Sequence, residues 1–223
     1  MKKVLTFAFC LILSISTAIF AVACNSSPDL YSCISELRKD TFVGECEHFN
    51  LTIYCGAKEN PSAFDGVKNP TSLFVTLKVT QSQATHENLT ATFTVGEKQY
   101  SAQLKNDNVK NCLTAELTVS ALPEKALEVT IYNDQTSAVI NATSILRSDT
   151  VTYTQAVNSA GEKAKDFIKQ NTVKGILKAE IIVRLLNQDS NNYYYVGFVT
   201  AEGLKQAYLI DAKTGNVIAQ KIN

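Results

Sequence analysis

The sequence has few of the residues from which common catalytic and metal sites are built. Histidine occurs only twice among 223 residues, as His48 and His86, and neither has a cysteine or carboxylate at the spacing of a zinc ligand set. The sequence also lacks the Gly-x-Ser-x-Gly motif, a phosphate-binding loop, a dinucleotide fingerprint and a His-Glu-x-x-His motif. We therefore expect no catalytic residues, no metal ion and no other cofactor, and the sequence predicts a protein that is not an enzyme.

An excess of positive charge is also missing. The chain has 21 basic and 21 acidic residues, and loss of Lys2 and Lys3 with the N-terminal segment would leave 19 basic residues and a formal charge of −2. No stripe of lysine and arginine follows any segment, which argues against a nucleic-acid partner. Beyond Ala23 no apolar run is long enough to span a membrane.

The first 23 residues have the pattern of an export signal. Met1-Lys-Lys3 is a basic start, Val4 to Ala23 carries no charge, and small residues precede Cys24 in Ala21-Val-Ala-Cys24. A basic region, an apolar region and a small-residue cleavage site together predict a signal peptide over residues 1–23. The polar segment 24–30 is typical of a tether.

The segment Ala21-Val-Ala-Cys24 resembles the cleavage site of bacterial lipoproteins processed by signal peptidase II, although Ala21 replaces the usual Leu. The resemblance implies a diacylglyceryl group with palmitate-type chains on Cys24, and an extracytoplasmic location at the cell membrane. Two alternatives stay open. Cleavage at the same bond without a lipid gives a secreted protein, and an uncleaved leader gives a membrane anchor, because about twenty apolar residues suffice to cross a bilayer.

The cysteine count fits an exported, lipidated chain. Of six cysteines, Cys10 leaves with the signal and Cys24 takes the lipid. The remaining four are Cys33, Cys46, Cys55 and Cys112. An even number in an exported protein permits two disulfides in three connectivities. We expect bridges that include Cys46, Cys55 or both, because they flank one predicted strand; buried free thiols are the alternative.

Residues 31–147 alternate between apolar and polar side chains. This pattern predicts strands over 49–55, 73–80, 89–95, 99–104, 113–119, 127–132 and 138–143, with residues 32–39 ambiguous. Gly96-Glu97 suits a tight hairpin turn. Short strands separated by turn signals predict an N-terminal β-sandwich with immunoglobulin-like connectivity.

Residues 148–223 change to a helical and then a strand pattern. Thr152-Tyr-Thr-Gln155 predicts a capping box, and the apolar stripe that follows predicts a helix over 152–170. Strands over 179–186, 193–200 and 205–211 are expected to cover that stripe, which makes the whole chain mainly β with an α+β C-terminal part.

The last hairpin carries a second resemblance. In Asp211-Ala-Lys-Thr-Gly215 the Asp carboxylate can accept from following amides and Gly215 can take a positive φ, so 207–210 and 216–220 can pair. This turn and the aliphatic residues around it resemble the end of PepSY-like modules. The resemblance implies a domain over 148–223 in which a helix packs on an antiparallel sheet.

Three consecutive tyrosines, Tyr193, Tyr194 and Tyr195, are the candidate partner-binding residues. Alternation along a strand places Tyr194 on one face and its neighbours on the other, and exposed aromatic side chains anchor partners. Packing of these rings against the N-terminal β-domain is the alternative.

Together these features predict a lipid-anchored, non-enzymatic binding module of the cell envelope whose partner is an extracellular protein or an envelope polymer. PepSY-like modules are associated with restraining or chaperoning extracellular peptidases, so the resemblance makes such a peptidase a candidate partner. One alternative is an envelope hydrolase with a site between the two domains, built from carboxylates such as Glu59 and Asp65. A purely structural surface protein is another.

Overall fold

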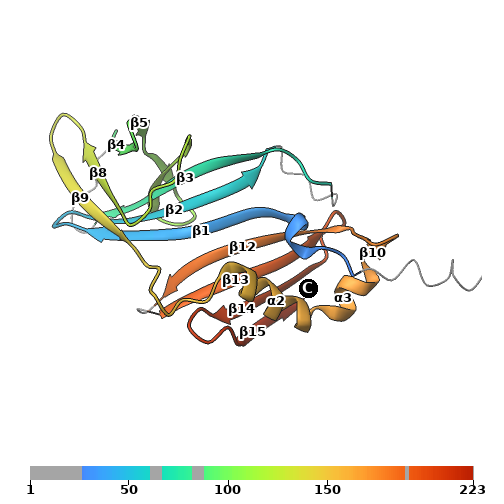
Figure 1. Cartoon of the computed structure of the whole chain (residues 1–223). Coiled ribbons are helices and arrows are strands. Elements are labelled where there is room, and N and C mark those ends of the chain that lie inside the picture. The colour runs from blue at the N-terminus through green and yellow to red at the C-terminus, as the bar shows by residue number, and fades with distance from the viewer. Residues whose placement is uncertain (1–26, 61–66, 82–87, 189–190, 223) are drawn as a thin grey trace, which may run out of the picture.

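The structure is a computed structural model that describes residues 27–60, 67–81, 88–188 and 191–222. Most of these residues lie in strands of one large, curved and mostly antiparallel sheet, and helices cover part of it (Figure 1). The mainly β fold class predicted from the alternation is therefore confirmed.

The first part of the described chain is almost entirely β. A 3-10 turn, η1 (Leu30–Cys33), leads into the strands β1 (Ile34–Glu45), β2 (Phe49–Glu59), β3 (Thr71–Gln81), β4 (Thr90–Val95), β5 (Lys98–Gln103), β6 (Lys105–Asp107), β7 (Cys112–Thr118), β8 (Ala126–Tyr132) and β9 (Ser137–Ser144). Each of the strands expected in this part from the period of two is present. Gly96 takes a φ of 60° in the β4–β5 turn, as the predicted tight hairpin requires.

The second part begins with helices and ends with a meander. Its elements are α2 (Tyr153–Lys163), α3 (Lys165–Gln170), the short ladder β10 (Thr172–Val173) and β11 (Ile176–Leu177), and then β12 (Ala179–Gln188), β13 (Asn191–Thr200), β14 (Lys205–Asp211) and β15 (Val217–Ile222). The predicted helix is thus present but is broken at Ala164, where ψ is 13°.

β1 is the strand around which the sheet is arranged. One edge of β1 pairs with β2, while its other edge pairs first with β12, in parallel, and then with β9. The path through the sheet is β15-β14-β13-β12-β1-β2-β3-β7-β6, and β9 leads on from β1 to β8, β4 and β5. Both parts of the chain therefore share a single sheet through β1.

The strand order differs from the immunoglobulin-like connectivity expected from the sequence. That fold divides its strands between two separate sheets. Here β1 pairs with both β2 and β9, and so it joins the strands β2, β3, β7 and β6 to the strands β9, β8, β4 and β5 in one sheet. β5 returns to the end of β7, where the Ser120 N–H donates to Tyr100 Oη at 2.9 Å. The result is nearly a barrel. The alternation along a strand shows which of its side chains are buried, but it does not show which strands pair with it. The expected immunoglobulin-like connectivity therefore had no support from the pattern itself.

The β1 strand was ambiguous in the sequence because its pairing is irregular. The register shifts between Arg38 and Asp40 against β2 and between Ile34 and Glu36 against β12. Such bulges insert an extra residue and break the period of two. Ile34 and Leu37, which pack against the same hydrophobic cluster, are consequently three residues apart instead of the two or four expected of a regular strand.

Two hydrophobic clusters lie along the sheet. The barrel core joins β1–β4 and β8–β9 and includes Phe42, Phe49, Leu51, Ile53, Val75, Leu77, Phe93, Val129, Ile131 and Ile140. The helix core lies between α2, α3 and the meander and includes Ala156, Val157, Ala160, Phe167, Ile181, Val183, Tyr194, Val196, Phe198 and Tyr208. Ile34 and Leu37 of β1 pack against the helix core, so β1 contributes to both clusters.

Local signals at the helix start and in the last turn are confirmed. Thr152 Oγ1 accepts from the Gln155 N–H at 3.2 Å, and Gln155 Oε1 accepts from the Thr152 N–H at 2.8 Å, which completes the capping box. Asp211 Oδ1 accepts from the Thr214 N–H at 2.7 Å, and Gly215 has a φ of 74°. These hydrogen bonds set the direction of α2 and the return of β15.

Candidate functional site

The candidate site is on the face of the sheet opposite the helices. In β12 the side chains of Ile181, Val183 and Leu185 enter the helix core, so those of Ile182 and Arg184 point to the other side. We call this side the open face. On it, cross-strand register aligns one residue from each of several strands; this arginine row consists of Phe74, Gly56, Arg38, Arg184, Tyr195 and Leu209.

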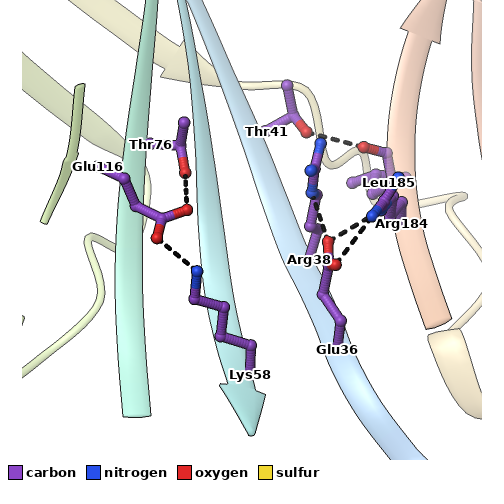
Figure 2. A network of polar contacts seen from close by, with 8 residues as sticks. All are labelled: Glu36, Arg38, Thr41, Lys58, Thr76, Glu116, Arg184 and Leu185. Carbon is purple, nitrogen blue, oxygen red and sulfur yellow. Dashed lines mark hydrogen bonds and ion pairs between the residues drawn. The ribbon is translucent and has the colours of Figure 1, made fainter. Parts of the chain in front are cut away.

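Glu36 joins the two arginines of this row (Figure 2). Arg184 donates from both Nε and an NH2 group to the two Glu36 carboxylate oxygens at 2.8 Å, and Arg38 Nε donates to Glu36 Oε1 at 2.8 Å. Burial alone raises the pKa of Glu36, but the hydrogen bonds and charges of Arg184 and Arg38 outweigh it and hold the pKa below its ordinary value. The carboxylate therefore stays ionised and fixes both guanidinium groups.

Aromatic rings flank the two arginines. The Arg38 guanidinium carbon lies 4.7 Å from the centre of the Tyr54 ring, and that of Arg184 lies 6.0 Å from the Tyr195 ring. Gly197 makes room for Tyr195, since a Cβ at Gly197 would lie 2.7 Å from Tyr195 Oη. Each guanidinium group and the aromatic ring beside it are thus held in place before a partner binds.

A second polar cluster continues the open face onto β2, β3 and β7. Lys58 forms an ion pair with Glu116, and Thr76 Oγ1 donates to Glu116 Oε2 at 3.1 Å (Figure 2). Lys58 Nζ also lies 5.4 Å from the Phe74 ring centre. The open face therefore carries charged or aromatic side chains from β1, β2, β3, β7, β12 and β13.

The chemistry of this surface is suited to recognition. Arginine stays protonated in proteins and therefore does not act as a general acid or base, but its planar fork binds carboxylate and phosphate oxygens and stacks on flat groups. In Arg38 only Nε has a described hydrogen-bond partner, and the side chain keeps 23% of its accessible surface. Its terminal nitrogens can serve an external acceptor.

The three predicted tyrosines separate onto two faces. Tyr194 is only 3% exposed in the helix core, and its Oη donates to the Val151 carbonyl at 3.0 Å. Burial, with a smaller contribution from the charge of Asp40, raises its pKa to about 12. Tyr194 is therefore a core residue, and a partner-binding role can apply only to Tyr193 and Tyr195, which lie on the open face.

The expected disulfides are absent, since Cys33, Cys46, Cys55 and Cys112 are all free thiols in the described part of the chain. Cys46 lies in the β1–β2 turn, where its N–H donates to the Phe49 carbonyl at 2.9 Å. Cys55 follows farther along β2, and a strand rising about 3.3 Å per residue puts it about 20 Å from that turn. A disulfide tolerates a Cα separation of only about 7 Å, so flanking one strand does not favour a bridge.

The other candidate residues are dispersed. Glu59 is 4% exposed at the end of β2, while Asp65, His86 and Cys24 lie outside the described residues. His48 packs edge-on against Phe49, with ring centres 6.5 Å apart. In the described ranges no group of three or more His, Cys, Asp or Glu side chains is placed to hold a metal ion. The hydrolase hypothesis based on Glu59 and Asp65 stays a prediction.

The sequence reasoning missed Glu36, Arg38 and Arg184. One local signal was present, because Arg184 interrupts the aliphatic run Ile181 to Leu186 at a position that alternation assigns to the exposed side. The partner of Arg184 could not be found in this way, since Glu36 is 148 residues away in the sequence.

Within the part of the chain that the structure describes, no helix has the length and apolar character needed to cross a membrane. Comparison with known proteins gives no relative: no protein-family model matches the chain, and no curated protein or solved structure matches it.

Proposed function

We propose that this chain is a lipid-anchored, extracytoplasmic binding module without enzymatic activity, and that it engages its partner through the open face. The observation that carries the proposal is the arginine row, in which Glu36 fixes Arg38 and Arg184 between the Tyr54 and Tyr195 rings. Interfaces are enriched in arginine and tyrosine anchors, and side chains that are already fixed before binding lose little conformational entropy when the partner docks.

The anchoring part of the proposal depends on the signal pattern over 1–23 and on Cys24. If Cys24 is lipidated, the intact mature protein has the mass of a chain starting at Cys24 plus a diacylglyceryl group. Cys24→Ala removes this increment. A mature chain of unmodified mass in the medium supports the secreted alternative instead.

We also propose that residues 31–147 and 148–223 are two structural domains, the second of them PepSY-like. The separate barrel and helix cores support the division, and the packing of α2 on β13 and β14 agrees with a helix lying on an antiparallel sheet. Two features differ from the expected module: the β10–β11 ladder follows the helices, and β12 pairs with β1 of the first domain.

The partner class follows from the exposed groups of the open face. A protein surface or an envelope polymer bearing carboxylates or phosphates can accept from Arg38 while flat or apolar groups pack on Tyr195. By its resemblance to PepSY-like modules, an extracellular peptidase is one candidate, and that step is an analogy from fold.

Site-specific photo-crosslinking in intact cells tests the binding face. A photoreactive residue is placed at Tyr54 or Tyr195, and the matched control is placed at Tyr132, which is 39% exposed on β8. We expect the first two positions to give the same crosslinked species, Tyr132 to give none of it, and Arg38→Gln to reduce it strongly. Equal crosslinking from all three positions would remove the open face from consideration.

A further inference from the structure

The strands bring several chain segments to one end of the sheet. Because β1 and β12 are parallel, with Ile34 opposite Ile181, the start of the described chain lies beside the start of β12. The β10–β11 ladder immediately precedes β12. The antiparallel partners Ala179 and Thr200 place the β13–β14 turn at the same end, and Gln206 opposite Ile222 places the end of β15 there. We call it the anchor end; in Figure 1 it is the side of the β10 label.

Exposed apolar side chains gather at the anchor end. They are Val173 and Ile176 on the β10–β11 ladder, Leu204 in the β13–β14 turn and Ile222 at the end of β15, with exposed fractions of 54%, 53%, 51% and 61%. Single exposed aliphatic residues are common on proteins, whereas several at one end indicate a contact surface.

Lysines surround these apolar residues. Among those exposed at the anchor end are Lys169, Lys174, Lys178, Lys205 and Lys221. The exposed carboxylates described there are Asp29, Asp166 and Glu202, so positive charge is in excess. The nearby Glu59 and Glu180 are buried. The chain as a whole has no net charge, which makes this local excess informative.

The attachment of the N-terminus points to the same end. Leu30 packs into the helix core beside Gly161, and Tyr31 Oη donates to Asn158 Oδ1 at 2.7 Å, so η1 is held against α2. Between Cys24 and Asp29 the chain can extend no farther than about 18 Å. A lipid on Cys24 would therefore keep this region of the protein close to the bilayer.

We infer that the anchor end is a membrane-contact surface, in which Val173 and Ile176 enter the interface of a bilayer and the surrounding lysines meet anionic lipid headgroups. Apolar side chains ringed by lysine are the combination that binds such an interface. This inference rests on the proposed lipid anchor. Its consequence is a fixed orientation: β1 and β12 rise from the membrane, so the open face is accessible from the side.

A single tryptophan can test the orientation, because the sequence contains none. Val173→Trp reports on the anchor end. Val139→Trp is the matched control, since Val139 has the same exposed fraction of 54% on β9, which runs beyond the opposite end of β1. The lipidated protein is bound to vesicles of phosphatidylcholine and phosphatidylglycerol, with or without lipids brominated in the acyl chain.

On these vesicles the Val173→Trp emission is expected to shift to shorter wavelength and to lose most of its intensity with brominated lipid, while the Val139→Trp emission stays unchanged. Lys174→Glu combined with Lys178→Glu should reduce the quenching. Ile176→Trp serves as a second reporter if Val173→Trp melts below the unsubstituted protein.

The outcomes separate the two proposals. If the protein floats with the vesicles but neither Val173→Trp nor Ile176→Trp is quenched, or Val139→Trp is quenched equally, the orientation is wrong and the lipid anchor stands. If the purified protein does not float with vesicles at all, the anchor itself is wrong and the membrane-contact surface falls with it.

Discussion

Among single residues, Asp40 is the carboxylate placed where the two cores meet. It is buried in β1, and its two oxygens accept from the Thr41 N–H at 2.7 Å and from Ser144 Oγ at 2.6 Å. Burial raises its pKa above the ordinary 3.8, and the two hydrogen bonds offset only part of that effect. Ionisation of the Asp40 carboxyl group is thus unfavourable in the folded protein, although both of its oxygens accept hydrogen bonds.

The stability contributed by Asp40 should accordingly fall with rising pH. Because its folded-state pKa is raised, this contribution is complete below the unfolded-state pKa and is lost as the pH rises through the folded-state pKa. Asp40→Asn keeps an acceptor for Thr41 and can donate to Ser144 without a buried charge. In urea unfolding at pH 7, we expect the unfolding free energy of Asp40→Asn to equal or exceed that of the unsubstituted protein. The difference between the two should shrink as the pH falls toward 3. A loss of stability at pH 7 that disappears in acid would contradict this account.

Glu36 has the opposite pH dependence. Its pKa is lowered by Arg184 and Arg38, so its contribution is present above the unfolded-state pKa and is lost as the pH falls through the folded-state pKa. Glu36→Gln should cost about 2 kcal/mol of unfolding free energy at pH 7, because two guanidinium groups lose a charged acceptor, and much less in acid.

Glu116→Gln is the matched control for Glu36→Gln. The Glu116 side chain is 47% exposed and its ion pair with Lys58 is solvated, so the same urea experiment should show a change of less than about 1 kcal/mol. Equal losses for the two variants would mean that the arginine row is not preorganised by Glu36.

At the scale of elements, α2 depends on its cap as well as on its buried stripe. Thr152 and Gln155 satisfy orphan amides of the first turn, and Ala156, Val157 and Ala160 face the meander. Thr152→Ala should lower the unfolding free energy by about 1 kcal/mol, as loss of an N-cap hydroxyl usually does. Lys163→Ala, at an exposed position near the end of α2, is the control and should change it by less than about 0.5 kcal/mol. An unfolding free energy that is unchanged by Thr152→Ala would show that tertiary packing alone determines where α2 starts.

The pairing of β1 with β2 depends on a close approach of the two backbones. A Cβ at Gly56 would lie 1.8 Å from the Leu37 carbonyl oxygen, a distance that no side chain can occupy. The glycine therefore permits the bulge near Arg38, and the bulge in turn allows Leu37 to face the helix core while Phe42 faces the barrel core.

On the scale of the whole molecule, the shared β1 strand makes the two cores interdependent. Ile34 and Leu37 supply part of the helix core, and the parallel β1–β12 pairing covers an edge of the meander that would otherwise be exposed. A fragment of residues 148–223 is expected to remain largely unfolded by circular dichroism, and the mature protein should unfold in one calorimetric transition. Two separate transitions, or a cooperatively folded fragment, would show that each domain is stable alone.

The local features of this protein were legible in its sequence because they depend on neighbouring residues. The alternation of Leu113, Ala115 and Leu117 predicts β7, Thr152 and Gln155 predict the start of α2, and Asp211 and Gly215 predict the last turn. Each of these signals acts through side chains and backbone groups only a few residues apart. They are sufficient to establish a mainly β chain with one helical segment.

Only the tertiary structure decided which strands are neighbours. The open face exists because β1 pairs with β2 on one edge and with β12 on the other, which aligns Arg38 with Arg184 and places Tyr195 next in the row. A strand's own pattern records which side chains are buried, whereas its choice of neighbour is settled by the packing of distant segments. The same non-local pairing brings the first described residues and the β10–β11 ladder to one end of the sheet.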